Sequence, residues 1–201
     1  TDQTQIGESW EISAVPGHVS VVDRGPLAGQ SLTELIDTYG ADLVGRHIYE
    51  RYGSAFPLLI KLIDAKAYLS VQVHPDDDLA ARRHNGSLGK TEMWYSILPA
   101  EGAYLYAGFS RRLDADSFRS AVADNSIIDS LRRHDTRPGD VFFLPAGRIH
   151  SIGRGNFVLE IQEASDITYR IYDYDRRDAQ GNPRQLHIEE SVGAIDFNDI
   201  A

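Results

Sequence analysis

Cysteine is absent from this chain of 201 residues, and methionine occurs only once. Without cysteine the chain forms neither disulfide bonds nor thiolate metal sites, which fits a reducing compartment. Any metal ion would therefore be held by the nitrogen and oxygen atoms of other side chains.

Long apolar runs and an excess of positive charge are missing as well. No stretch approaches the roughly 18 apolar residues of a membrane helix, and the polar start, TDQTQIGESW, lacks a signal-peptide pattern. The formal net charge is −10, and the arginine pairs are short, scattered and flanked by acids, which is typical of a solvated surface. We therefore expect a soluble, cytoplasmic protein that binds neither membranes nor nucleic acid.

The chain has the composition of a folded globular domain, with 42% hydrophobic and 25% charged residues. Many short apolar segments alternate with Gly and Pro turns at roughly 8–12-residue spacing, which predicts a mostly β sandwich or barrel. Helical patterns follow the capping box of Ser31 and Glu34 and cover residues 76–84 and 114–131. We expect one domain over residues 1–201, with a helical insert near 114–131.

Residues 69–74 alternate strictly between apolar and polar side chains. On a strand, Gln72 and His74 would point to one side and Val71 and Val73 to the other, so an amide and an imidazole converge. A half-exposed strand with outward polar residues would give the same pattern.

A second motif spans residues 139–150 and has the form G-D-x4-P-x-G-x2-H. It predicts a turn, a core strand, a tight turn at Pro145 and then His150, facing the interior of a barrel. The spacing matches the second motif of the cupin proteins. Glu92 opens another predicted strand and adds a carboxylate. With the amide and imidazole of the first motif, these residues form a set of two nitrogen and two oxygen ligands. The set is suited to zinc in a catalytic site and consists of Gln72, His74, Glu92 and His150.

Longer stretches of the chain are similar, in their order, to one enzyme family. These stretches are KLIDAKAYLSVQVHP at residues 61–75, GKTEMW at 89–94, PAGRIH at 145–150 and EIQEASDITYR at 160–170. They resemble the type I mannose-6-phosphate isomerases, and YDYDR at residues 172–176 resembles the short bacterial branch.

The resemblance implies a cupin β-barrel and a zinc-dependent aldose–ketose isomerase. Its partner would be a sugar phosphate, and it would interconvert mannose 6-phosphate and fructose 6-phosphate through an enediol. One zinc ion per chain would be bound by Gln72, His74, Glu92 and His150. The resemblance places Arg170, Glu160 and Lys90 among the catalytic residues, and Lys61 and Ser70 near the substrate phosphate.

Each of these residues also has an ordinary structural explanation. Glu160 alternates with apolar neighbours and could face outward, Lys61 and Lys90 could face solvent, and Arg170 could pair with a neighbouring aspartate. The general base is left open between Glu160 and Lys90.

Two rival functions remain. A non-catalytic cupin that binds a sugar phosphate would keep the ligands but would not require Glu160, Lys90 and Arg170 together. An iron-dependent cupin oxygenase is disfavoured because that class prefers three histidines or two histidines and a carboxylate, whereas Gln72 stands at one ligand position.

Overall fold

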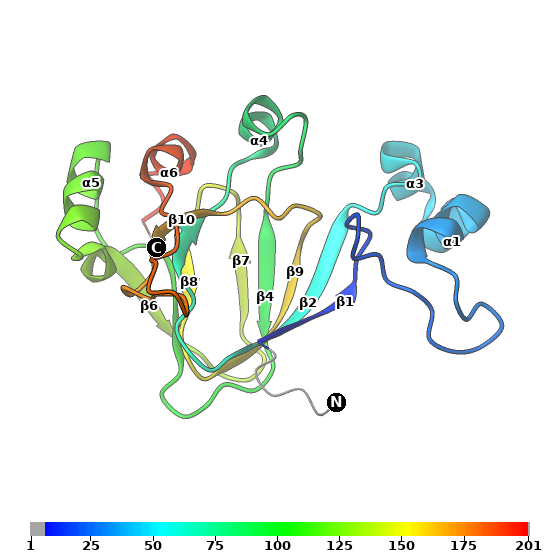
Figure 1. Ribbon diagram of the computed structural model, residues 1–201, viewed down its shortest axis with the longest axis horizontal. Helices are drawn as coiled ribbons and strands as arrows, with labels where there is room; N and C mark the ends of the chain where they lie inside the picture. The colour runs from blue at the N-terminus through cyan, green and yellow to red at the C-terminus, as the bar shows by residue number, and fades with distance from the viewer. Residues whose placement is uncertain (1–6, 201) are drawn as a thin grey trace.

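Two five-stranded antiparallel sheets pack face to face in the computed structural model, which describes residues 7–200 (Figure 1). Sheet I has the order β1 (Glu8–Ile12), β2 (Leu58–Ala65), β9 (Asn156–Glu163), β4 (Glu92–Ser96) and β7 (Val141–Leu144). Sheet II has the order β10 (Tyr169–Tyr172), β3 (Val71–Val73), β8 (His150–Ile152), β5 (Tyr104–Phe109) and β6 (Leu131–Asp135). The expectation of a mostly β, cupin-like fold is confirmed.

Helices lie around the sandwich rather than within it (Figure 1). They are α1 (Leu32–Tyr39), α2 (Ala41–Val44), α3 (Arg46–Tyr52), α4 (Asp77–Arg83), α5 (Ala115–Ala123), the 3₁₀ helix η1 (Ile127–Ser130) and α6 (Ile188–Ala194). The predicted capping box is present, because the Ser31 hydroxyl accepts from the backbone of Glu34 while the Glu34 carboxylate accepts from that of Ser31. None of these helices has the length and apolar character to cross a membrane, within residues 7–200.

The helix expected over residues 114–131 is interrupted. α5 ends before Asp124, whose carboxylate accepts a hydrogen bond from the backbone of Ser126, and Asn125 between them is left-handed, with φ 63°. Such local side-chain bonds compete with the helical ladder. Leu131, placed at the end of the predicted helix, instead begins β6.

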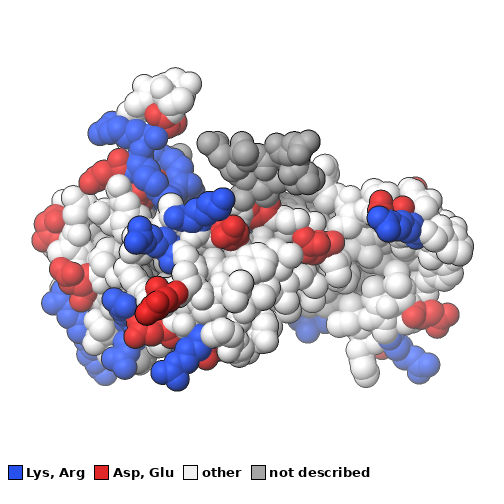
Figure 2. Space-filling view, turned by 90° about the horizontal axis from the view of Figure 1, so that it is seen from below, with Lys and Arg blue, Asp and Glu red and all other residues white. Residues whose placement is uncertain are grey.

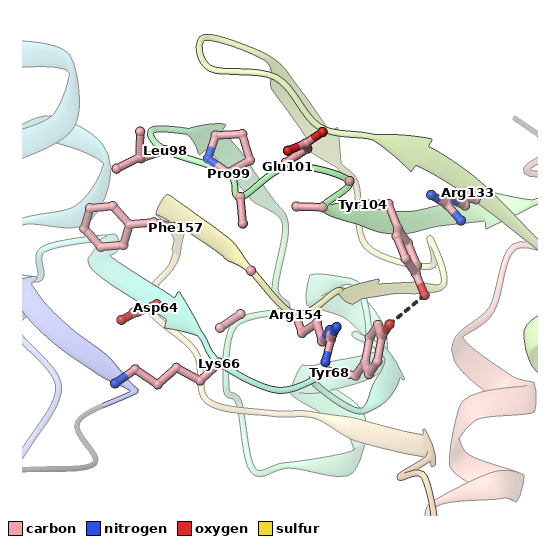
Figure 3. Close-up of a pocket in the computed structure, with 15 residues that line it drawn as sticks. Asp64, Lys66, Tyr68, Leu98, Pro99, Glu101, Tyr104, Arg133, Arg154 and Phe157 are labelled. Atoms are coloured by element: carbon pink, nitrogen blue, oxygen red, sulfur yellow. Dashed lines mark hydrogen bonds between the residues drawn. The ribbon is translucent and has the colours of Figure 1, made fainter.

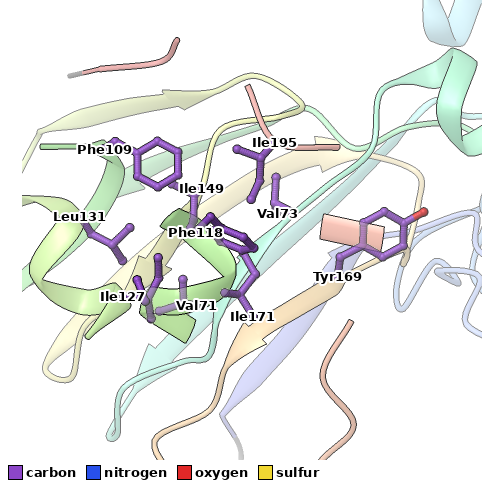
Figure 4. Packing of buried hydrophobic residues seen from close by; sticks show 11 residues of the cluster. Val71, Val73, Phe109, Phe118, Ile127, Leu131, Ile149, Tyr169, Ile171 and Ile195 are labelled. Atoms are coloured by element: carbon purple, nitrogen blue, oxygen red, sulfur yellow. The ribbon is translucent and has the colours of Figure 1, made fainter. Parts of the chain in front are cut away.

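Two apolar clusters flank sheet II. One lies between the sheets and includes Trp94 and Leu144 of sheet I with Leu105 and Ile152 of sheet II. The other lies on the outer face of sheet II, where α5 and η1 cover it (Figure 4). Val71 and Val73 belong to the outer cluster and Gln72 points between the sheets, so the predicted alternation is confirmed for Val71–Val73. Leu69, expected on the same face as the two valines, instead packs against the cluster between the sheets. The regular pairing of β3 is shorter than predicted and covers only Val71–Val73.

The polar start of the chain lies largely outside the described residues. The expectation that TDQTQIGESW is not a signal peptide falls on residues 1–6 and the first residues of β1. It stays a prediction.

Candidate active site

Three buried side chains converge between the two sheets. His74 directly follows β3, Glu92 begins β4 and His150 begins β8. Their ligand atoms all lie within 4.8 Å of one another. His150 Nε2 is 3.2 Å from Glu92 Oε1, and His74 Nε2 is 3.5 Å from Glu92 Oε2. We call these residues the His–Glu–His group.

The Nδ1 atom of each imidazole forms a hydrogen bond that fixes the orientation of the ring. His74 Nδ1 donates to the Ile167 carbonyl at 2.9 Å, and His150 Nδ1 donates to the Arg148 carbonyl at 2.8 Å. Because a carbonyl only accepts, each Nε2 is left as a lone pair aimed at the Glu92 carboxylate. His74 Nε2 and Glu92 Oε1 are buried without a hydrogen-bond partner, whereas Glu92 Oε2 lies 3.1 Å from the Lys90 ammonium. Buried acceptors that face one another are unfavourable unless a cation lies among them, so these residues fit a metal ion.

Burial and neighbouring charges hold this group in the protonation states that metal ligation requires. Burial lowers the pKa of His74 to about 3 and also lowers the pKa of His150, so both imidazoles are neutral. Burial opposes the charge of Glu92, but the Lys90 ammonium outweighs it and holds the Glu92 pKa well below its usual range. Neutral imidazoles and an ionised carboxylate are the forms that bind a divalent metal.

Gln72 lies beside the His–Glu–His group. It pairs with His150 in the register of β3 and β8, and its Nε2 is 3.3 Å from His150 Nε2. A half-turn of the amide would bring its oxygen to the same place. The position therefore suits the predicted fourth ligand, whose role stays a prediction.

A cavity of about 380 Å³, here called the cleft, opens beside this group. It gathers the six remaining residues named from the sequence. They come from β2, the segment before β3, β3 itself, the segment before β4, β9 and β10: Lys61, Ser70, Gln72, Lys90, Glu160 and Arg170. Five cationic side chains and two carboxylates line the cleft, although the whole chain is acidic. The cleft is therefore suited to an anion.

Glu160 lies in the centre of a row that crosses sheet I. In the strand register it pairs with Lys61 on one side and Trp94 on the other. Lys61 Nζ is 3.2 Å from Glu160 Oε1, and Trp94 Nε1 donates to Glu160 Oε2 at 2.8 Å. Glu160 is only 3% exposed and Lys61 9%, so Glu160 does not face outward and Lys61 does not face open solvent.

The ordinary structural explanations given above for Lys90 and Arg170 do not match their positions in the structure either. Lys90 is buried, with Nζ 3.1 Å from Glu92 Oε2. Burial opposes its charge, but the Glu92 and Glu160 carboxylates raise the pKa of Lys90 and keep it protonated. Arg170 forms no ion pair recorded within residues 7–200. Its Nη1 donates to the Gln185 carbonyl at 3.1 Å, and its buried Nε has no hydrogen-bond partner.

Sequence reasoning missed two arginines of the cleft. Arg176 and Arg184 both line it, and both bind the buried carboxylate of Asp173. Arg176 also donates to the Tyr68 carbonyl at 2.7 Å. The one sequence feature that could have indicated these arginines was Asp173, an acidic residue that continues the alternating burial pattern of β10. Nothing in the loop sequence showed that Arg184 returns to it.

The segments that carry His74 and Glu92 cross in direct contact. The backbone N–H of Lys90 donates to the Pro75 carbonyl at 3.0 Å. A Cβ atom on Gly89 would lie 2.5 Å from the carbonyl carbon of Asp76 and 2.7 Å from the Pro75 oxygen. Only glycine fits this crossing, because both obstacles are backbone atoms.

The chain is similar in sequence and in fold to known mannose-6-phosphate isomerases. Residues 1–96 match the family model of the phosphomannose isomerase type I catalytic domain. The chain is 43% identical over 196 residues to a probable mannose-6-phosphate isomerase of Bacillus subtilis, covering 98% of this chain and 60% of that one. It is 40% identical to the crystal structure of the mannose 6-phosphate isomerase from Bacillus subtilis, with a TM-score of 0.83, covering 94% of this chain and 59% of that one. A zinc-bound mannose 6-phosphate isomerase structure, 18% identical, shares the fold, with a TM-score of 0.69 over 96% of this chain and 66% of that one.

Two packed antiparallel sheets with an inward-facing His–Glu–His group define a cupin-type fold that could hold one metal ion. Within that class, the chain is similar over 94–98% of its length to proteins named as mannose-6-phosphate isomerases, and residues 1–96 match the type I catalytic-domain model. It spans about 60% of the length of the curated relatives it matches.

Proposed function

We propose that this protein is a zinc-dependent aldose–ketose isomerase that interconverts mannose 6-phosphate and fructose 6-phosphate. The observation that carries the proposal is the cleft, where a metal-ligand group, a buried carboxylate and five cations meet. The similarity to mannose-6-phosphate isomerases supports the substrate. Residues 1–201 would form one cupin-type catalytic domain, and a cytoplasmic location remains an expectation from the sequence.

His74, Glu92 and His150 would hold the zinc ion, with Gln72 as a weaker neutral ligand. Bound zinc would supply Lewis-acid polarisation of the sugar oxygens at C1 and C2. Three classical ligands and one weak neutral amide would suit a catalytic zinc site rather than a closed structural one.

Glu160 is the general base in this proposal, and it moves the proton between C2 and C1 through an enediol. Lys61 and Trp94 fix the carboxylate of Glu160 at both oxygens, and each oxygen keeps a second lone pair for the substrate proton. Lys90 is already paired with Glu92, so it would act as a positive charge beside the developing enediolate. These contacts support Glu160 rather than Lys90 as the base.

The arginines would receive the negative charges of the substrate. Arg170 projects from β10 with an unpartnered Nε, which suits the enediolate oxygens or the phosphate. Arg176 and Arg184 add two guanidinium groups to the same cleft. Ser70 would donate a hydroxyl to the phosphate, while Lys61 contributes charge from its place beside Glu160.

Metal content and fructose 6-phosphate formation from mannose 6-phosphate, measured on one purified sample, test the proposal. We expect one zinc ion per chain, activity that is lost on chelation, and recovery when zinc is returned. His150→Ala should lose both metal and activity, whereas His47→Ala, on the exposed face of α3, should lose neither. Zinc-loaded protein that binds mannose 6-phosphate without converting it would instead support the non-catalytic rival.

A further inference from the structure

A second and larger cavity lies at the opposite end of the sandwich. Its volume is about 830 Å³, within the roughly 300–1,000 Å³ typical of small-molecule sites. β4 and β8 begin at Glu92 and His150, whereas this cavity is lined by residues beyond the other ends of those strands, such as Pro99 and Arg154. No catalytic or ligand residue proposed above is among the described residues that line it. We call it the distal cavity.

Two tyrosines form a rigid aromatic wall in the distal cavity (Figure 3). The Tyr104 hydroxyl donates to that of Tyr68 at 3.0 Å. The Arg133 guanidinium covers the Tyr104 ring at 3.8 Å and is itself bound to Asp135. The Tyr68 ring stacks on Tyr174, with centroids 5.3 Å apart. The Tyr68 and Tyr104 rings are tilted by 44° to each other, so a planar ligand would stack on one ring and meet the edge of the other, at low entropic cost because both rings are held in place.

Two cations reach the distal cavity without partners of their own. Unlike Arg133, neither Arg154 nor Lys66 makes a side-chain hydrogen bond or ion pair recorded within residues 7–200, and both line the cavity. Figure 3 shows the guanidinium of Arg154 beside the ring of Tyr68. A free planar guanidinium suits a phosphate group, and Lys66 adds a second positive charge to the lining of the cavity.

The remaining polar side chains of the distal cavity are carboxylates. Asp64 and Glu101 line it, and within the described chain neither side chain has a recorded hydrogen bond or ion pair. Carboxylates in dinucleotide sites accept hydrogen bonds from ribose hydroxyls. Phe157 supplies a further apolar surface (Figure 3). The cavity thus offers partners for a planar ring, a diol and a phosphate.

We propose that the distal cavity binds a nucleoside phosphate. The base stacks on the aromatic wall formed by Tyr68 and Tyr104, the ribose hydroxyls bind Glu101, and the phosphate binds Arg154. This site is separate from the cleft and does not depend on the proposed isomerase activity.

Calorimetric titration of the metal-loaded protein with ADP tests this proposal, with adenosine and inorganic pyrophosphate as separate probes. We expect saturable binding of ADP that is tighter than the binding of either fragment. Arg154→Ala should weaken ADP binding at least about tenfold, because one charge-assisted bidentate contact is lost. Arg112→Ala, an exposed arginine that does not line the distal cavity, is the matched control and should leave ADP binding unchanged. The melting temperature of each variant reports whether the fold is intact.

A second comparison separates the distal cavity from the cleft. ADP binding should be the same in Arg170→Ala, which alters the cleft, and Glu101→Ala should weaken ADP but not pyrophosphate. Absence of saturable heat with ADP would overturn the proposal. So would ADP binding that Arg170→Ala abolishes and Arg154→Ala leaves intact, because the ligand would then occupy the cleft.

Discussion

Glu160 is the general base of the proposed mechanism, and the rate of proton transfer depends on it. Glu160→Gln keeps the shape and the hydrogen bond from Trp94 but cannot accept a proton. We expect kcat to fall by about 10²–10⁴-fold, the usual contribution of a positioned base, with zinc content unchanged. Uptake of deuterium from heavy water into the sugar, followed by NMR, measures the step directly.

Glu50→Gln, on exposed α3, is the control for Glu160→Gln and should behave as wild type. Unchanged deuterium uptake in Glu160→Gln would transfer the role of base to another residue of the cleft.

Arg170 has two possible roles that kinetics can separate. If it stabilises charge present only in the transition state, Arg170→Ala should lower kcat by about 10²–10³-fold, as for a lost oxyanion donor. If it binds only the phosphate, KM should rise while kcat stays nearly constant. Arg170→Lys keeps the charge without the planar fork. Zinc content should stay at the wild-type level in both variants, and kinetic constants near wild type in Arg170→Ala would make the residue structural.

At the scale of an element, Asp173 ties the end of β10 to the loop that carries Arg176 and Arg184. Hydrogen bonds from both arginines outweigh burial and hold the pKa of Asp173 below its usual value. The stability that follows from this shift is present above the unfolded-state pKa, near 3.9. It is lost as the pH falls through the lower folded-state pKa.

Asp173→Asn should therefore lower the free energy of unfolding at pH 7 by about 1–2 kcal/mol, since the partial exposure of both arginines limits the effect. The difference from wild type should shrink below about pH 4, because the wild-type carboxylate then becomes protonated. Urea unfolding at several pH values measures this difference. Asp175→Asn, on the exposed part of the same loop, should show no such dependence, and a constant deficit at all pH values would contradict the ion-pair explanation.

The sequence predicted the elements with a clear local pattern. The strand predicted between the turns at Gly139 and Pro145 is β7, although it was expected in the core and instead lies at the edge of sheet I with Val141 and Phe143 exposed. α4 was expected within one residue at each end, because a capping aspartate marks its start. β6 and α6 were not predicted. β6 reads LRRHD, with few apolar residues, and α6 has only seven residues and contains Gly193. Both are stabilised by tertiary packing that no local window contains.

The same division holds for the site. Gln72 and His74 could be placed on one side from strand alternation alone, and His150 from its turn motif. Arg184 could not, because its place depends on a long loop folding back to a carboxylate 11 residues earlier. Side chains fixed by strand register are predictable, whereas those delivered by an irregular loop are not.

At the scale of the whole molecule, the charge of the cleft opposes that of the protein. The formal net charge is −10, yet five cations line the cleft. Figure 2 shows that Lys and Arg gather on the left half of the visible face. Attraction of a dianionic substrate is therefore local, and free mannose, which lacks the phosphate, should be a very poor substrate.

Comparison of kcat/KM for mannose and mannose 6-phosphate measures this preference. We expect the preference for the phosphorylated sugar to weaken as salt is added, because screening reduces attraction between exposed charges. A comparable kcat/KM for the two sugars would remove the basis for a phosphate site in the cleft.

Gly89 is a position where substitution should disrupt the metal site, although Gly89 is not itself a proposed metal ligand. Gly89→Ala touches neither the zinc ligands nor the substrate, yet it would force apart the two backbones that set the spacing of His74 and Glu92. In a screen of random substitutions scored by zinc retention, position 89 should be as intolerant as a ligand, even to the smallest side chain. A tolerant Gly89, by contrast, would show that the crossing can open without moving the metal site.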